Sequence, residues 1–260
     1  MITTGVLSED AKELASLANE NLGILTGKCQ QKEELQDYYL GILRRQAIIL
    51  LDLERLLKGR NSGLITTPFI ILRSLMDDFL HLLYLELFVG DKYEEIVKIN
   101  AKAHKQVFQS LKDLTESNHK YFNDKYPFYL THEQYKTVQE KFVSIPENEK
   151  YFRDKESFKF KSFITLAEMV KKINASRDVN IFRDRAFYLW KEFSGFVHYS
   201  NFSFYLELKE DVTHLQKMDE AFQYTYNSIY LSFKHFERAL ELKFIDNEVL
   251  QEKYGIIHDC

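Results

Sequence analysis

The sequence TPFIILRSLMDDFLHLLYLELFVG, residues 67–90, decides the fold class of this chain. Thr67 supplies a capping hydroxyl and Pro68 suits the first position of a helix, so a helix is predicted from Pro68 to Gly90. Its apolar side chains lie nearly all round the helical axis rather than along one face. Because such a helix must be covered by others, we expect it at the centre of a bundle.

Other segments carry apolar residues at the three-and-four spacing of helices that bury one face. The predicted helices are 7–26, 32–58, 93–116, 164–173, 179–198 and 217–242, with a short tail helix after Asn247. Ser8 is the predicted N-cap of the first, and Asp91 caps the helix that starts at Tyr93. With only 9 glycines and 3 prolines in 260 residues, few positions interrupt a helix. These patterns predict an all-α, up-and-down helical bundle.

Helical periodicity weakens between residues 117 and 161. Thr131-His-Glu-Gln134 matches a capping box before a short helix, and the alternation in 158–163 indicates a short extended segment. We therefore expect an irregular insertion around 117–161. No linker divides the chain, so a single helical domain over 1–260 is predicted, with its core roughly in 31–116 and 162–245.

The charge balance limits the partners of this chain. Lys and Arg number 35 against 39 Asp and Glu, a formal net charge of −4, so nucleic acid would have to bind to a local basic patch. The only cysteines, Cys29 and Cys260, form no disulfide framework. No signal peptide and no uncharged stretch of roughly 18–20 residues is present, so a cytoplasmic protein without membrane contact is expected.

Three of the polar residues in the apolar central helix share one spacing. Arg73, Asp77 and His81 are each four residues apart, so they lie on one face of it. A buried charge needs a partner, so we expect each of these groups to have a hydrogen-bonding or oppositely charged partner. One interpretation is structural, with an intrahelical ion pair between Arg73 and Asp77 and a hydrogen-bonded core histidine at His81. The other is a functional site.

A second polar stripe lies on the late helix 179–198. Lys191, Ser194 and His198 fall at i, i+3 and i+7 beside aromatic residues. If this stripe faces the first, cations, a carboxylate, a hydroxyl and two imidazoles come together. Such a set suits acid–base cleavage of a phosphodiester, with histidine moving protons and the cations neutralising phosphate.

The two stripes carry a family resemblance. The late helix reads YLWKEFSGFVHYS over 188–200 and the central helix reads LRSLMDDF over 72–79. This pairing resembles the HEPN superfamily of helical bundles, and more narrowly a branch with Ser, three residues, then His. The resemblance covers roughly 35–89 and 179–242.

The resemblance implies a metal-independent ribonuclease of a bacterial toxin or antiviral defence system, with its site between two protomers. Catalytic members carry Arg, four to six residues, then His. His198 matches the histidine, whereas Lys191 stands at the arginine position. His198 is then the predicted general acid or base, Arg73 and Lys191 the phosphate clamp, and Asp77 the residue that orients Arg73 or His81. The alternative is a non-catalytic module that acts through a nucleotide or a partner protein.

The segment KYFRDKESFKFKSF, residues 150–163, alternates basic and aromatic side chains. This pattern is typical of single-strand-binding surfaces, so we predict RNA contacts from its cations, Arg153, Lys155, Lys159 and Lys161. The alternative is a solvated loop whose aromatic rings pin it to a core. Carboxylate–imidazole pairs such as Glu116 with His119 do not add up to a di-iron pattern, so no metal and no cofactor is predicted.

Overall fold

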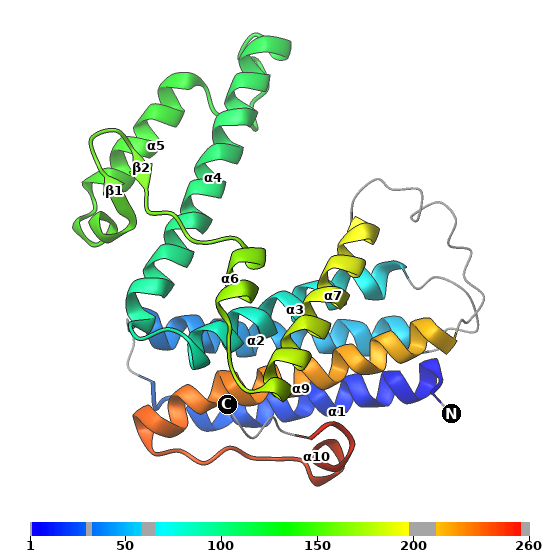
Figure 1. Ribbon diagram of the computed structural model, residues 1–260. Coiled ribbons are helices and arrows are strands. Elements are labelled where there is room, and N and C mark those ends of the chain that lie inside the picture. Colours follow the sequence, from blue (N-terminus) through cyan, green and yellow to red (C-terminus); the bar gives the residue numbers. More distant parts are fainter. Residues whose placement is uncertain (1, 30–32, 59–65, 198–211, 256–260) are drawn as a thin grey trace. The chain divides into compact units, whose positions relative to one another are not determined.

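The computed structural model describes residues 2–29, 33–58, 66–197 and 212–255 (Figure 1). Throughout these ranges the chain is helical apart from turns and one two-stranded sheet, which confirms the predicted all-α fold. It forms two compact units, Met1–Gly90 with Thr165–Cys260, and Asp91–Ile164. In the described ranges, no helix combines the length and apolar character needed to cross a bilayer.

The first unit is an up-and-down bundle. Its helices are α1 (Thr4–Leu25), α2 (Glu34–Leu57), α3 (Thr66–Leu87), α6 (Leu166–Lys172), α7 (Arg177–Val197), α9 (Val212–Leu240) and α10 (Glu248–Tyr254). Contacts of Tyr39 with Glu86 and of Arg45 with Asp78 show that α2 and α3 run antiparallel. The long helices α1, α2, α3, α7 and α9 therefore alternate in direction along the chain (Figure 1).

Helix α3 is central to this unit, as its apolar pattern predicts. It packs against α2, α6, α7 and α9, and side chains such as Phe69, Leu75 and Phe79 are completely buried. Phe69 stacks on Phe193 of α7 with ring centroids 4.9 Å apart. This helix begins at Thr66 and ends at Leu87, slightly before the predicted bounds.

The predicted N-cap of the first helix is wrong. Helix α1 begins at Thr4, and Thr3 caps it by accepting a hydrogen bond from the Val6 amide at 3.2 Å. Ser8 lies inside the helix, where its hydroxyl donates to the Glu54 carbonyl of α2 at 3.1 Å. Thr3 and Ser8 are both of residue types that cap helices, and the hydroxyl of Ser8 is used instead in the contact with α2.

The second unit consists of α4 (Lys92–Phe122), α5 (His132–Ser144), the 3-10 helix η1 (Pro146–Tyr151) and the strands β1 (Phe152–Asp154) and β2 (Lys159–Phe160). The strands are antiparallel, with Phe152 opposite Phe160. The predicted caps of both helices, Asp91 and the Thr131 capping box, are confirmed. Helix α4 belongs to this unit and extends past Glu116, so the segment 117–161 contains more regular structure than its periodicity indicates.

Candidate functional site

The contact between α3 and α7 joins the two polar stripes at Arg73. Its Nε donates a hydrogen bond to the Ser194 hydroxyl at 2.7 Å, and its guanidinium carbon lies 5.0 Å from the centre of the Trp190 ring. Ser194 in turn donates to the Trp190 carbonyl at 2.7 Å. The guanidinium is therefore fixed by a hydroxyl on one side and by an aromatic face on the other.

Arg73 has no carboxylate partner within the described ranges. The intrahelical ion pair with Asp77 is not formed, because Arg73 turns towards α7. Its Nε is engaged by Ser194, whereas its two Nη groups have no hydrogen-bond acceptor in the part of the chain that the structure describes. A half-buried guanidinium that is held in this way and has no carboxylate partner among the described residues is suited to bind an anion bidentately.

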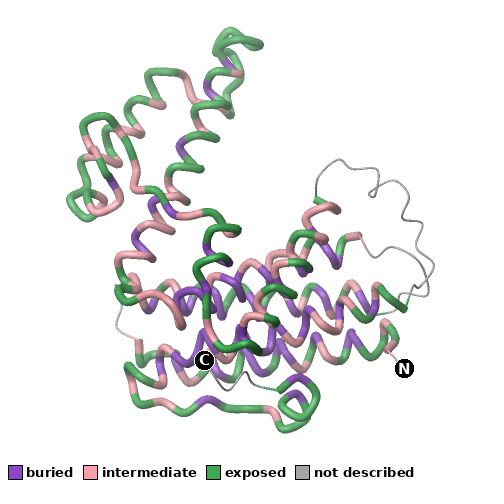
Figure 2. Tube along the Cα trace, in the orientation of Figure 1, coloured by how far each residue is buried: buried purple, intermediate pink, exposed green. Residues whose placement is uncertain are grey.

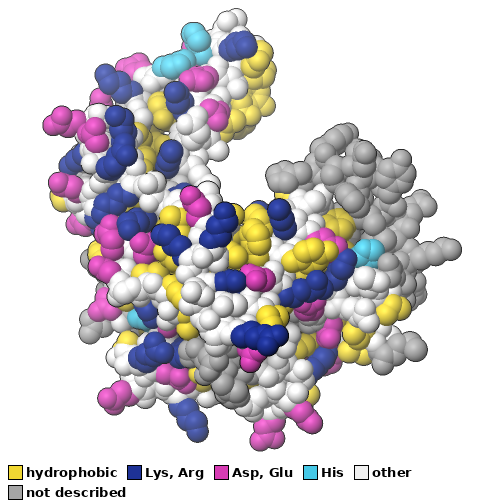
Figure 3. Space-filling view, viewed as in Figure 1, with side chains coloured by type: hydrophobic (Ala, Val, Ile, Leu, Met, Phe, Trp, Pro, Cys, Tyr) yellow, Lys and Arg dark blue, Asp and Glu magenta, His cyan; other side chains and the backbone are white. Residues whose placement is uncertain are grey.

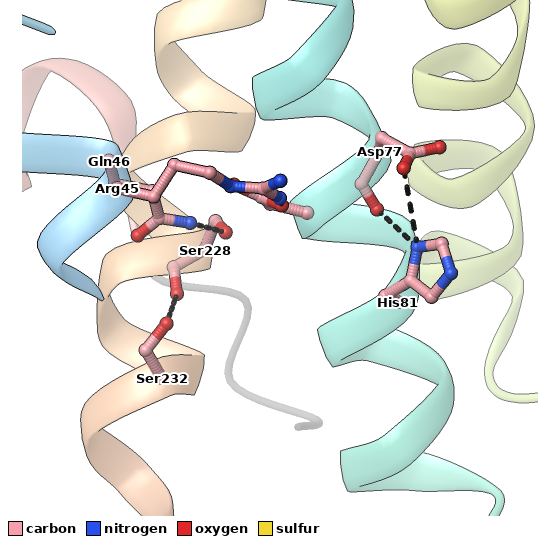
Figure 4. A network of polar contacts seen from close by, with 7 residues as sticks. Arg45, Gln46, Asp77, His81, Ser228 and Ser232 are labelled. Carbon is pink, nitrogen blue, oxygen red and sulfur yellow. Dashed lines mark hydrogen bonds and ion pairs between the residues drawn. The ribbon is translucent and has the colours of Figure 1, made fainter. Parts of the chain in front are cut away.

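Asp77 and His81 form a separate pair on α3, shown in Figure 4. The Nδ1 atom of His81 lies 2.8 Å from the Asp77 carbonyl oxygen and 3.8 Å from its carboxylate Oδ2. Since a carbonyl oxygen only accepts, Nδ1 carries the proton in this contact and Nε2 is the basic ring nitrogen. The hydrogen bond within the helix thus orients the imidazole.

The other two predicted residues are not part of these contacts. Lys191 lies on α7 with its side chain exposed, and no hydrogen bond or ion pair joins it to Arg73 or Ser194. His198 lies outside the described residues. The structure therefore brings together Arg73 with Ser194 and Asp77 with His81, while the contribution of Lys191 and His198 stays a prediction.

An ion pair between the half-exposed Arg45 and the buried Asp78, next to this face, was not predicted from the sequence. Asp78, only 2% exposed, accepts hydrogen bonds from Arg45 of α2, with Nε to Oδ2 at 3.2 Å and a second contact between Nη2 and Oδ1. The neighbouring Gln46 donates to the Ser228 hydroxyl of α9 at 2.5 Å (Figure 4). These contacts tie α2 to α3 and α9. The sequence signal was Arg45, a cation within a helix of mostly apolar residues.

Tyr38 of α2 adds a neutral hydroxyl to the same region. Burial raises the pKa of Tyr38; the nearby Arg45 guanidinium opposes this effect and the Asp77 carboxylate adds to it. The phenol therefore stays protonated at neutral pH and can donate a hydrogen bond but cannot act as a base. Proton transfer on this face would depend on histidine.

The cations predicted to bind RNA lie in the second unit, on and around its hairpin. Lys161 pairs with Glu94 at 3.2 Å and Lys155 with Glu149 at 3.8 Å, whereas Arg153 and Lys159 are exposed. The aromatic rings of this segment, Phe152, Phe158 and Phe160, pack against one another and against Phe108 of α4 and Phe142 of α5. The alternative interpretation, a segment pinned by its aromatic residues, is correct for the rings. RNA binding by the four cations stays a prediction.

Comparisons with known proteins leave this geometry as the main evidence on function. No family model, no curated protein and no solved structure matches the chain.

Proposed function

We propose that the chain is a HEPN-like protein that binds a phosphate of RNA at Arg73 and cleaves the RNA without a metal ion. The observation that carries this proposal is the fixed guanidinium of Arg73, which is held by Ser194 and Trp190 and has no described carboxylate partner. An arginine prepared in this way can neutralise the charge that develops on a phosphodiester during cleavage.

Three groups have roles in the proposed reaction. Arg73 binds the phosphate through its Nη groups, and Ser194 keeps the guanidinium in place. His198, four residues after Ser194 in the sequence, is the general acid or base that the HEPN resemblance implies. The resemblance also implies a site shared by two protomers, so we expect the active protein to be a homodimer.

One observation favours a second candidate, a non-catalytic helical module that binds RNA, a nucleotide or a partner protein. The residue at the arginine position of catalytic HEPN members is Lys191, and its exposed side chain makes no contact with Arg73 or Ser194. An ammonium group lacks the planar fork that holds a phosphate bidentately. Such a protein would retain the anion site and lack the cleavage step.

The test separates binding from cleavage. Wild type, Arg73→Gln and His198→Ala are incubated with total cellular RNA in excess chelator, and their affinity for a short fluorescent RNA is measured by anisotropy. We expect Arg73→Gln to weaken binding about tenfold or more, because it removes a charge-assisted contact. His198→Ala should bind as wild type does and fail to cleave.

Arg185→Gln is the matched control. Arg185 lies on the same helix as Ser194, but its charge is already satisfied by Glu220, with contacts of 2.7 and 2.9 Å. RNA binding by this variant should be unchanged. Binding without cleavage by the wild type would select the non-catalytic module, and equal binding by Arg73→Gln and wild type would reject the site.

A further inference from the structure

Three side chains with metal-binding atoms meet in the second unit. The Nδ1 atom of His119 lies 2.9 Å from Oδ2 of Asp124, and the rings of His119 and His132 are 5.0 Å apart and nearly perpendicular, at 87°. One ligand atom from each of the three residues lies within 4.8 Å of the others. Histidine side chains are visible at the surface of this unit in Figure 3.

The backbone places these residues together at the end of α4 and the start of α5. Asn123 and Asp124 both adopt left-handed conformations, with φ of 50° and 58°, and turn the chain back over the last turn of α4. The buried Asn118 fixes this turn by accepting hydrogen bonds from the amides of Asp124 and Tyr126. His132 is the first residue of α5, whose start is fixed by the Thr131 capping box.

The separations are close to those of a metal site. Four ligands at about 2.0–2.1 Å from a zinc ion in tetrahedral geometry are separated from one another by roughly 3.3 Å. The His119–Asp124 contact is slightly shorter than this value, and the widest separation, within 4.8 Å, is somewhat longer. Side-chain rotations at the surface can bridge both differences, since none of the three residues is confined by a core.

We propose that His119, Asp124 and His132 form a binding site for one divalent transition-metal ion of the zinc type. Two imidazoles and one carboxylate provide nitrogen and oxygen donors, a mixture that suits zinc-type ions. Magnesium and calcium prefer sites with oxygen donors alone. The side chains of His119 and Asp124 are 64% and 35% exposed, so water completes the coordination. The site is independent of the proposed RNA cleavage, which needs no metal ion.

From the sequence, His119 was considered as a metal ligand only together with Glu116, one turn earlier on α4. In the structure Glu116 pairs instead with Lys112 at 3.6 Å. The partners of His119 come from beyond the end of the helix, where spacing along a helix gives no guidance. The prediction of no metal rested on the absence of a complete di-iron pattern and did not consider Asp124 and His132 together with His119.

The test is a calorimetric titration of the full chain with Zn²⁺, supported by Co²⁺ absorption in the visible range as a report on coordination. We expect one ion per chain in the wild type. Asp124→Asn should weaken Zn²⁺ binding at least about tenfold, and His119→Ala with His132→Ala should abolish it. Asp113→Asn is the matched control, because Asp113 is an exposed carboxylate of α4 that pairs with Gln109 at 2.8 Å.

A second measurement does not depend on affinity alone. Zn²⁺ should slow amide exchange in residues 119–132 of the wild type and leave exchange in the first unit unchanged. All three ligands are exposed, so the variants should keep the helicity of the wild type. Equal binding by the wild type and the double histidine variant, or no binding by the wild type, would overturn the proposal.

Discussion

The two units of this chain bury their helices to very different degrees (Figure 2). In the first unit, α3 has 12 buried residues among its 22, and most of the buried side chains are apolar. In the second unit, α4 has 6 buried residues among its 31, and α5 has none. Since burial of apolar surface is the main stabilising contribution, the first unit should be the more stable of the two.

The units also differ in how they use polar groups. The first unit buries them in contacts between helices, as in Arg45 with Asp78 and Gln46 with Ser228. The second unit buries Thr115 and Asn118, which bond to the backbone of α4 and of the turn after it, and both units have capped helix starts. Buried polar contacts fix the register of helices, whereas capped ends fix only where each helix starts. The following predictions test this difference.

The largest effect is expected for Phe79→Ala in the first unit. Phe79 is completely buried and contacts Phe182 and Tyr224 at 5.7 and 5.3 Å between ring centroids. Its removal leaves a cavity and should lower the free energy of unfolding by about 3–5 kcal/mol. Urea unfolding gives this value, and amide exchange should rise across the first unit alone.

The control is Ile48→Ala, because Ile48 is 62% exposed on α2 and its loss should change stability by no more than about 0.5 kcal/mol. A matching rise of exchange in 91–164 after Phe79→Ala would show that the two units unfold together, contrary to the comparison.

A smaller loss is expected for Phe108→Ala in the second unit. Phe108 is 6% exposed and contacts three other rings, those of Phe142, Phe158 and Phe160. We expect a loss of about 3 kcal/mol and faster amide exchange confined to 91–164. Phe128→Ala, which removes an 83% exposed ring of the same unit, should have little effect. Similar results for both variants would mean that the ring cluster does not stabilise the unit.

The smallest effects concern two capping boxes, one in each unit. Thr131 with Gln134 starts α5, and Thr165 with Glu168 starts α6. Replacing either threonine by alanine should cost about 1 kcal/mol in the stability of its own unit. Amide exchange in the first turn of each helix measures the loss.

The two boxes should respond differently to acid. Hydrogen bonds from Thr165 lower the pKa of Glu168 below its usual value. The stabilisation is therefore present above the pKa of Glu168 in the unfolded chain and is lost as the pH falls through the folded value. Acidification from about pH 7 to about pH 3 should loosen the start of α6 and spare α5, because Gln134 does not titrate. Equal loosening of both helices would contradict this assignment.

Residue patterns predicted the fold better than they predicted the site. The apolar sequence at 67–90 was enough for a central helix. The functional interpretation depended on whether the stripes of Arg73 and Ser194 face each other, and the structure joins them through one hydrogen bond between these two residues. On a helix that is apolar nearly all round, however, periodicity does not reveal which of two adjacent carboxylates is buried. Asp77 was selected as a site residue by its spacing from Arg73 and His81, and the structure shows that the buried carboxylate is the adjacent Asp78.

The site in the second unit shows a different limit. His119, Asp124 and His132 meet because two consecutive residues, Asn123 among them, adopt left-handed conformations. Asn and Asp tolerate this conformation, but nothing in their neighbours requires it. Contacts that depend on such a turn cannot be predicted from the residue pattern and are identified only from the structure.

The ion pair between Lys161 and Glu94, at 3.2 Å, has a consequence for how this protein can change over generations. The two residues stand close to the first and last positions of the second unit, so the two ends of this segment lie close together. A segment with adjacent ends takes the place of a loop and is tolerated as an insertion. Residues 91–164 are therefore of the kind that a bundle accepts as an insertion between two of its helices, and sequence changes confined to them should leave the bundle intact.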